Sequence, residues 1–142
     1  MRKIVPGDHP CYCVRVRRAA NALTKFYDKK IETINLTISQ FSLLHDIKLL
    51  ETCNKSELAQ YAKLDRTTII RNLNILFKGH YIAEIPGPSN RNNLIQLTDL
   101  GESTLTEGMI FWKQAQAKIE EMIGQDDIEN FTRILTNIES LV

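Results

Sequence analysis

The segment from Asp65 to Gly79 carries the start, the end and both faces of one helix, and it constrains the fold of this chain most strongly. Asp65 is suited to cap the free amides of a first turn, and Gly79 to take the left-handed conformation after a last turn. Ile69, Leu73 and Leu76 have the i, i+4, i+7 spacing of one buried face. We expect the opposite face to carry donors suited to phosphate oxygens and base edges, namely Arg66, Thr67, Thr68, Arg71 and Asn72. Taken alone, the segment fits either a DNA-contacting helix or an amphipathic helix with a solvated polar face.

Two capping motifs before this segment predict two further helices. Residues 37–40, Thr-Ile-Ser-Gln, form a capping box that opens a helix running to about residue 50. Residues 54–57, Asn-Lys-Ser-Glu, repeat the device for a short helix, which only Lys63 and Leu64 separate from Asp65. Two short helices with such a connection, the second with a polar N-terminal half, are typical of a helix-turn-helix.

A hairpin is expected directly after Gly79. Residues 81–85 and 94–97 alternate as strands do, and residues 86–93 between them are turn-forming. A hairpin after such a helix is a wing, and its tip carries Arg91 beside Asn90, which suit phosphate or the minor-groove floor. Lys55, Ser56 and Lys78 are further candidates for contacts with a DNA backbone.

Both ends of the chain predict long amphipathic helices. The first has Pro10 at its start and an apolar rhythm from Tyr12 to Ile34. Thr98 caps a second, which runs to about residue 123, and residues 126–129 open a third. Their apolar stripes exceed what the small central module can cover. We therefore expect a helical region that a second copy of the chain completes.

The distribution of charge is more informative than the net charge of +1. Residues 1–98 hold 15 Lys/Arg against 8 Asp/Glu, a net +7, and residues 99–142 hold 3 against 9, a net −6. This asymmetry indicates a basic working surface joined to an acidic region. No apolar run approaches the roughly 20 residues of a membrane span, and the N-terminus lacks the apolar segment of a signal peptide, so we expect a cytoplasmic protein.

The sequence contains no set of residues typical of an enzyme. The three histidines fall on an arm, a helix and a turn, and no nucleophile–base–orienter set accompanies them. Three cysteines without a zinc-like pairing indicate neither a disulfide framework nor a structural metal. We expect neither a metal nor a cofactor.

Four segments taken together resemble the MarR family of winged helix-turn-helix transcriptional regulators. They are residues 36–44, 56–59, 65–73 and 94–101, and their order and spacing span nearly the whole chain. The resemblance implies a mainly α fold with a small β-hairpin wing, ordered as four helices, two strands and two helices. It also implies an obligate homodimer. Residues 1–35 would then form the N-terminal arm and long helix of the dimerisation region, residues 36–98 the winged helix-turn-helix module, and residues 99–142 the C-terminal dimerisation helices.

The family pattern also assigns roles to single residues. It brings Thr67, Thr68 and Arg71 to the major groove and Arg91 to the minor groove. The sequence departs from that pattern at two positions. Ser89 stands where an aspartate usually steadies the wing arginine, and Lys63 stands where glycine is common in the turn.

Two regulatory sites are expected from the same resemblance. Cys11 and Cys13 lie at the first turn of the N-terminal helix, where a helix dipole favours thiolate, and hydroperoxide-sensing members carry a reactive cysteine near this point. Cysteine is also a small, readily buried residue, so a structural role stays open. Members of the family also bind aromatic or phenolic acids beside the dimerisation helices. The candidate lining residues, whose alternative role is core packing or solvation, are Tyr12, Arg15, Phe41, His45 and Trp112.

These observations predict a homodimeric, sequence-specific DNA-binding regulator of the repressor type. Its operator would be a pseudo-palindromic double-stranded DNA with half-sites about one helical turn apart. A small aromatic or phenolic effector, or cysteine oxidation, would modulate its affinity. The alternative is a winged helix used only for protein contacts.

Overall fold

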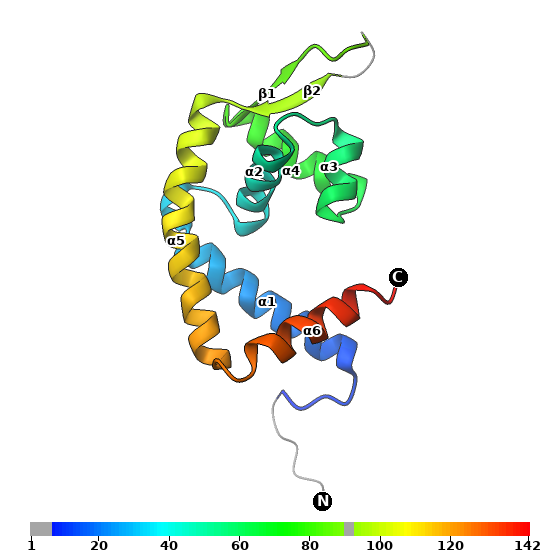
Figure 1. Cartoon of the computed structure of the whole chain (residues 1–142), viewed down its shortest axis with the longest axis vertical. Helices are drawn as coiled ribbons and strands as arrows, with labels where there is room; N and C mark the ends of the chain where they lie inside the picture. Colours follow the sequence, from blue (N-terminus) through cyan, green and yellow to red (C-terminus); the bar gives the residue numbers. More distant parts are fainter. Residues whose placement is uncertain (1–6, 90–92) are drawn as a thin grey trace, which may run out of the picture.

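Helices dominate the chain, and one hairpin is the only sheet in the part that the structure describes. The structure is a computed structural model, and it describes residues 7–89 and 93–142. The mainly α fold with a small wing is confirmed, in the predicted order (Figure 1). The elements are α1 (Tyr12–Lys30), the 3-10 helix η1 (Glu32–Ile34), α2 (Ile38–Leu50), α3 (Lys55–Ala62), α4 (Arg66–Lys78), β1 (Ile82–Ile85), β2 (Leu94–Leu97), α5 (Asp99–Ile123) and α6 (Ile128–Glu139).

Side-chain caps begin the central helices where the sequence predicts them. The Thr37 hydroxyl accepts from the Gln40 amide at 3.3 Å, and the Gln40 carboxamide oxygen accepts from the Thr37 amide at 3.0 Å. Asn54 accepts from the Glu57 amide at 2.8 Å at the start of α3. Thr98 begins α5 in the same way. Each bond satisfies an amide that a first turn leaves without an intrahelical partner.

The predicted N-terminal helix is shorter at both ends than its sequence rhythm indicates. Cys11, not Pro10, precedes the first helical residue, and α1 ends at Lys30 instead of continuing to Ile34. Ile31 and Ile34 are buried in the core, and Asn35 adopts a left-handed conformation with φ of 59°. The apolar spacing in the sequence extends past the end of α1 because Ile31 and Ile34, which follow it, pack in the core with α2.

The end of α4 differs by one residue from the prediction. Gly79 has φ of −81°, whereas His80 is the left-handed residue with φ of 64°. The His80 amide donates to the Phe77 carbonyl and the Tyr81 amide to the Leu76 carbonyl, both at 3.0 Å, which is the Schellman pattern. Glycine is needed at position 79 for space, since a Cβ there would lie 2.4 Å from the Tyr81 ring.

The hairpin is tied to the connection between α2 and α3. β1 and β2 pair antiparallel with Ile82 opposite Leu97. Beyond them, Cys53 and Ile95 exchange two backbone hydrogen bonds, of 3.1 Å and 2.7 Å. This bridge, which the sequence did not predict, anchors the base of the wing to the helix-turn-helix.

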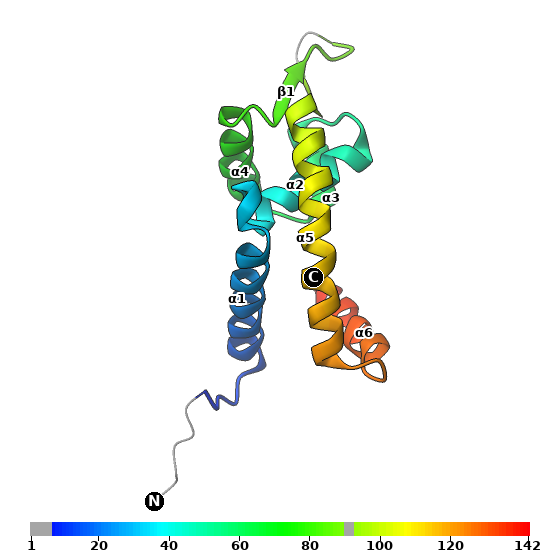
Figure 2. The same cartoon turned by 90° about the vertical axis from the view of Figure 1, so that its left-hand side faces the viewer.

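The hydrophobic core lies in the module formed by η1, α2–α4 and the hairpin. Its buried residues fall between Ile31 and Ile95, with Leu105 of α5 added to them. α5 runs from the hairpin past α2 and then along α1, and α6 turns back from its far end (Figures 1 and 2). None of the 19 residues of α1 or the 12 of α6, all described, is buried. Within the described residues, every helix is too short or too polar to cross a membrane.

Candidate nucleic-acid interface

The helix α4 is held rigidly by its cap and its buried face. The Asp65 carboxylate accepts from the Thr68 amide at 2.8 Å and from the Thr68 hydroxyl at 3.0 Å. Those two bonds, the backbone one first, lower the pKa of Asp65 from its ordinary value of 3.8. Ile69 and Leu76 are fully buried and Leu73 is 1% exposed, so the orientation of the helix on the module is set.

The exposed face of α4 overlaps the predicted face only in part, since Thr67 and Arg71 are exposed on it, Thr68 is half-buried and Arg66 lines a hollow beside the wing. Asn72 is only 7% exposed, so its placement on the outward face was wrong. At 3.6 residues per turn it lies about 40° from Leu76 and about 60° from Ile69, at the edge of the buried side. A full count of the helical angle would have selected Asn74 instead. We call the exposed side chains that lie together opposite the core the outward face; they are Thr67, Arg71, Asn74 and Lys78.

A second group of predicted contacts gathers beside the base of the wing. An open hollow of about 310 Å³ lies between the start of α3, the start of α4 and the hairpin. Lys55, Ser56 and Arg66 line it together with Glu84, which accepts from Asn93 Nδ2 at 3.1 Å. Sequence reasoning did not select Asn93 or Glu84 for this place, because their approach depends on the pairing of the hairpin.

The turn between α3 and α4 contains a lysine where glycine would fit the backbone. Lys63 has φ of 53° and ψ of 41°, and its amide bonds back to the carbonyls of Ala59 and Gln60. The side chain is exposed. The short turn therefore forms without glycine and presents one more cation beside the two helices.

Comparison with solved structures identifies the family. MosR, a transcriptional regulator of Mycobacterium tuberculosis whose structure was solved in complex with DNA, is 32% identical to this chain. The match covers 90% of this chain and 92% of that one, with a TM-score of 0.81. The chain belongs to the MarR family of transcriptional regulators. The predicted family is thus confirmed.

More distant MarR-family structures share the fold. The transcriptional repressor CouR, bound to a DNA duplex, is 20% identical with a TM-score of 0.86, and the match covers 97% of this chain and 99% of that one. A mutant MarR from E. coli complexed with operator DNA is 16% identical with a TM-score of 0.80, over 87% and 89% of the two chains. No protein-family model matches the sequence, and no curated protein matches it.

The tip of the MarR-type wing lies outside the described residues. The predicted contacts of Asn90 and Arg91 fall there, so their placement stays a prediction. Ser89, at the position where the family pattern has an acid, is exposed at the edge of the described hairpin.

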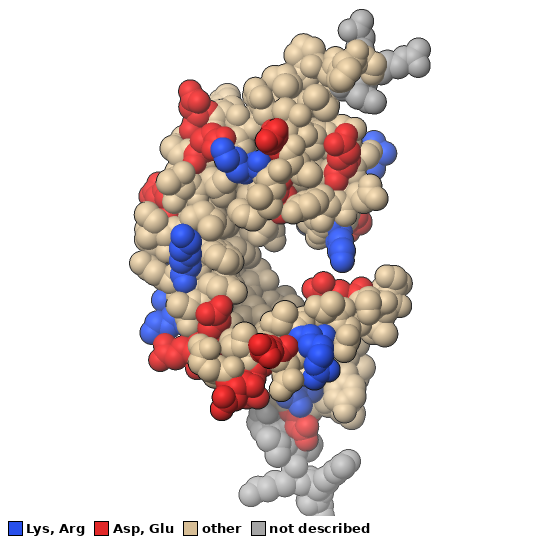
Figure 3. All heavy atoms as spheres, viewed as in Figure 1, with Lys and Arg blue, Asp and Glu red and all other residues tan. Residues whose placement is uncertain are grey.

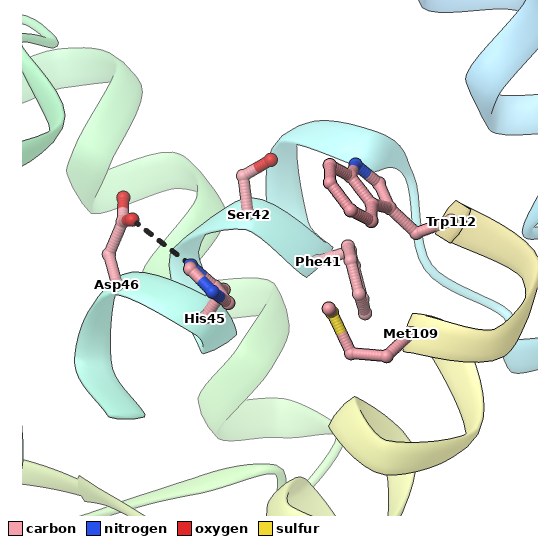
Figure 4. A pocket seen from close by; sticks show the side chains of 6 residues that line it. All are labelled: Phe41, Ser42, His45, Asp46, Met109 and Trp112. Carbon is pink, nitrogen blue, oxygen red and sulfur yellow. Dashed lines mark ion pairs between the residues drawn. The ribbon is translucent and has the colours of Figure 1, made fainter. Parts of the chain in front are cut away.

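Three of the five predicted effector-binding residues come together. Phe41 and His45 from α2 and Trp112 from α5 line a cavity of about 210 Å³ (Figure 4). Ser42, Asp46 and Met109 complete the lining. His45 Nδ1 lies 3.9 Å from Asp46 Oδ1. Burial raises the pKa of Asp46, against the opposing effect of His45.

Tyr12 and Arg15 do not join that cavity. Both lie in the first turns of α1, and Tyr12 is 85% exposed. In Figure 1 this end of α1 lies far from α2. The two residues therefore belong to the exposed surface of α1 and not to the cavity beside α2.

The cysteines have different surroundings. Cys11 precedes α1 and Cys13 lies in its first turn, and both are exposed. The Cys11 amide donates to His9 Nδ1 at 3.0 Å. Cys53 is buried, and desolvation raises the pKa of its thiol to about 11, which disfavours the nucleophilic thiolate. Among the described residues, no group of three or more His, Cys, Asp or Glu could hold a metal ion.

Proposed function

We propose that this chain is a sequence-specific, double-stranded DNA-binding transcriptional repressor that acts in the cytoplasm as a homodimer. The observation that carries the proposal is the outward face of α4. It offers one arginine, one lysine, one carboxamide and one hydroxyl on a helix whose other face is locked in the core. Those groups suit the base edges and phosphates of a major groove, which is wide enough for a helix.

The contacts divide between bases and backbone. Thr67, Thr68 and Arg71 lie in the first half of α4, the part of such a helix that reaches base edges. Lys55, Ser56 and Arg66 line the hollow beside the wing, where a phosphate would meet two cations and a hydroxyl against one carboxylate, that of Glu84, which Asn93 engages. Asn90 and Arg91 would extend the contacts into the minor groove. The solved complex of MosR with DNA, at 32% identity, supports this use of the fold.

A homodimer follows from the surfaces that a single chain leaves uncovered. An open apolar hollow of about 530 Å³ lies between α1, α5 and α6. Apolar side chains of α6, including Ile134 at 48% exposed and Ile138 at 40%, also face outward. We assign residues 1–35 and 99–142 to a dimerisation region that a second copy covers, leaving residues 36–98 as the DNA-binding module. Two-fold symmetry would then present two α4 helices to a pseudo-palindromic operator.

Charge also favours pairing between copies at this end of the molecule. The exposed start of α1 carries Arg15, Arg17 and Arg18. Acidic side chains gather where α5 meets α6 (Figure 3), and those exposed there are Glu120, Glu121, Asp126, Asp127 and Glu129. Basic and acidic ends of opposite sign steer two copies together.

Regulation is the finer part of the proposal. An effector in the cavity beside α2 would sit between Phe41 of the DNA-binding module and Trp112 of α5, so it would bear on the angle between module and dimerisation region. The volume of about 210 Å³ is enough for a single ring, since a cavity of about 150 Å³ admits benzene. The carboxylate of Asp46 disfavours an anionic ligand, so a neutral phenol fits better than an acid. Oxidation of Cys11 or Cys13 is the competing signal.

Selection of bound sequences from random duplex DNA tests the function and the signal together. We expect a palindrome with half-site centres about one helical turn apart. Repeating the selection with a phenol and with a hydroperoxide identifies the signal as the treatment that abolishes recovery. Salt-insensitive self-association without any duplex binding would instead indicate a winged helix used for protein contacts.

Salt dependence of affinity tests the outward face directly. If the Arg71 guanidinium contacts a phosphate, Arg71→Ala is expected to reduce the slope of log affinity against log salt concentration by about one unit per protomer. If it contacts a guanine, the same replacement is expected to relax the base preference at one operator position. Arg133→Ala is the matched control, because Arg133 is an exposed arginine on α6, away from α4. An unchanged slope and an unchanged selected sequence in Arg71→Ala would remove α4 from the interface.

A further inference from the structure

The hydroxyl of Thr68 is already engaged before any DNA arrives. Thr68 is the third residue of α4, and Asp65, the residue that caps the helix, uses both of its carboxylate oxygens on it. Oδ1 accepts from the Thr68 amide at 2.8 Å, and Oδ2 lies 3.0 Å from Thr68 Oγ1. The side chain of Thr68 is half-buried at the edge of the outward face.

The direction of this hydrogen bond is set by chemistry. An ionised carboxylate has no proton to donate, so the Thr68 hydroxyl must be the donor. The pKa of Asp65 is lowered, mainly by the amide and hydroxyl of Thr68, which keeps the carboxylate ionised at neutral pH. Because a hydroxyl has one proton and two lone pairs, Thr68 Oγ1 can offer only lone pairs to any further partner.

The base edges of the major groove differ in what they can give to such an oxygen. Adenine N6 and cytosine N4 carry amino protons, whereas guanine O6 and N7 and thymine O4 only accept. A free threonine hydroxyl rotates to suit either class and does not distinguish them. A hydroxyl whose proton is held elsewhere can bond only to the amino class.

We propose that Asp65 fixes Thr68 as a hydrogen-bond acceptor, so that the recognition helix selects adenine or cytosine over guanine or thymine at one position of each half-site. The proposal rests on the proposed function, because it requires α4 to lie in a major groove. Asp65 acts as a positioning residue, and Thr68 is the specificity-determining residue that touches the base.

The neighbouring Thr67 provides an internal comparison. Its side chain is exposed on the outward face, and its hydroxyl makes no hydrogen bond to any residue that the structure describes. It is free to donate to a phosphate or a base acceptor, or to accept. Thr67 and Thr68 therefore share a side chain and differ in the polarity that they present.

The replacement Asp65→Asn reverses the polarity of Thr68 while keeping the cap. Asparagine caps helices as well as aspartate does. Its carbonyl oxygen must face the Thr68 amide, which leaves its NH₂ group facing Thr68 Oγ1 as a donor. The hydroxyl proton is then released toward the groove. We expect the selected base at one symmetric pair of operator positions to change from adenine or cytosine to guanine or thymine.

The size of the change is that of a single neutral hydrogen bond. We expect relative affinities for operators that differ at that position to change by about 2-fold to 10-fold. Thr68→Val, which removes the hydroxyl and keeps the branched shape, should lose discrimination at the same position. Thr67→Val should leave discrimination there unchanged. Circular dichroism and size-exclusion chromatography of each variant should match those of the wild type.

Selection from random duplexes with these four proteins separates the outcomes. A wild type that selects a palindrome, with the same base at every position in Asp65→Asn and Thr68→Val, would overturn the role of Asp65 and Thr68 and leave the proposed function standing. A guanine or thymine in the wild-type operator at the position that Thr68→Val relaxes would overturn it as well. A wild type that selects no sequence would contradict the proposed function and this assignment with it.

Discussion

The DNA-binding module and the two terminal helices, α1 and α6, both contain many apolar side chains, but they bury them to different extents. In the module, apolar side chains from α2, α3, α4 and the hairpin meet one another, and Leu44, Ile47 and Leu58 are fully buried. In α1 and α6, none of the described residues is buried, although both helices are rich in apolar side chains. The module therefore has a core of its own, whereas α1 and α6 have none within a single chain.

Helix α6 shows most clearly which apolar surface a single chain leaves exposed. Its apolar residues, which are Ile128, Phe131, Ile134, Leu135 and Ile138, all lie within one stripe of about 120° on a helix of 3.6 residues per turn. A stripe of this width is normal for a helix that packs on a core. In a single chain Phe131 is the one residue of this stripe that lines the open hollow beside α1 and α5.

A charge placed on that stripe is expected to have the largest effect. Leu135→Glu should weaken dimerisation by about 2–4 kcal/mol, the cost of losing a buried contact at an interface, which is about 30-fold to 1,000-fold in the dissociation constant. Operator affinity should fall with it, because the two α4 helices would no longer be linked. Analytical ultracentrifugation measures the dimer.

The control is a charge on the opposite side of the same helix. Thr136 is exposed and lies about 100° from Leu135, outside the apolar stripe. Thr136→Glu should leave the dimer intact. Equal dissociation constants for Leu135→Glu and the wild type would contradict the prediction, since the apolar stripe of α6 would then not pack against a second chain.

Helix α5 joins the DNA-binding module to the terminal helices, and a replacement in it can show whether a change in one region affects the other. At Gly108 its backbone approaches the core so closely that a Cβ would lie 2.4 Å from Phe41 Cε2 and 2.9 Å from Ile34 Cδ1. Gly108→Ala is expected to destabilise the protein by about 1–3 kcal/mol through overpacking, less any gain in helix propensity of up to about 1 kcal/mol. Because Phe41 belongs to the DNA-binding module and also lines the cavity beside α2, operator affinity should change although no DNA contact is touched.

Urea unfolding and operator titration of Gly108→Ala, beside Glu107→Ala, provide the measurement. Glu107 is exposed one residue away on α5, so its replacement leaves the contact with α2 unaltered. A stabilised Gly108→Ala protein with unchanged operator affinity would show that α5 and the module adjust independently.

Local chemistry made the boundaries of the central helices predictable. Thr37, Asn54, Asp65 and Thr98 are all observed caps, because a cap depends only on residues within one turn of the helix start. The predicted end of the helix that Thr98 caps, at about residue 123, is also correct, since α5 ends at Ile123 and the next residue is a glycine.

Features that depend on the folded chain were missed or misplaced. The Cys53–Ile95 bridge joins residues more than forty positions apart, and neither side chain signals it. The left-handed residue after α4 is His80, and Gly79 lies instead where the Tyr81 ring approaches the backbone closely. The cavity beside α2 contains Asp46 and Met109, which the family resemblance did not indicate, and not Tyr12.

The smallest expected effect is on the pH dependence of stability, and it is tested at two aspartates, one at the start of α4 and one at the start of α6. Asp65 begins α4 and accepts two hydrogen bonds, whereas Asp127 begins α6 without a side-chain cap bond. Since the pKa of Asp65 is lower in the folded protein, its contribution to stability is fully present above the ordinary carboxyl value of 3.8 and is lost as pH falls through the folded-state pKa. On acidification below about pH 4, the free energy of unfolding of the wild type should therefore fall more than that of Asp65→Asn, which has no carboxylate at this position to protonate.

Asp127→Asn is the matched control, because Asp127 makes no cap bond that the charge of its carboxylate could strengthen. Thermal unfolding from pH 6 to pH 3 measures both. The raised pKa of Asp46 acts in the opposite direction, but it is common to all three proteins and cancels in the differences. Equal pH dependence for the two variants would mean that the caps of module and terminal helix are equivalent. A pH dependence confined to Asp65→Asn would show that a charged cap bond stabilises the start of α4, whereas α6 begins without such a bond.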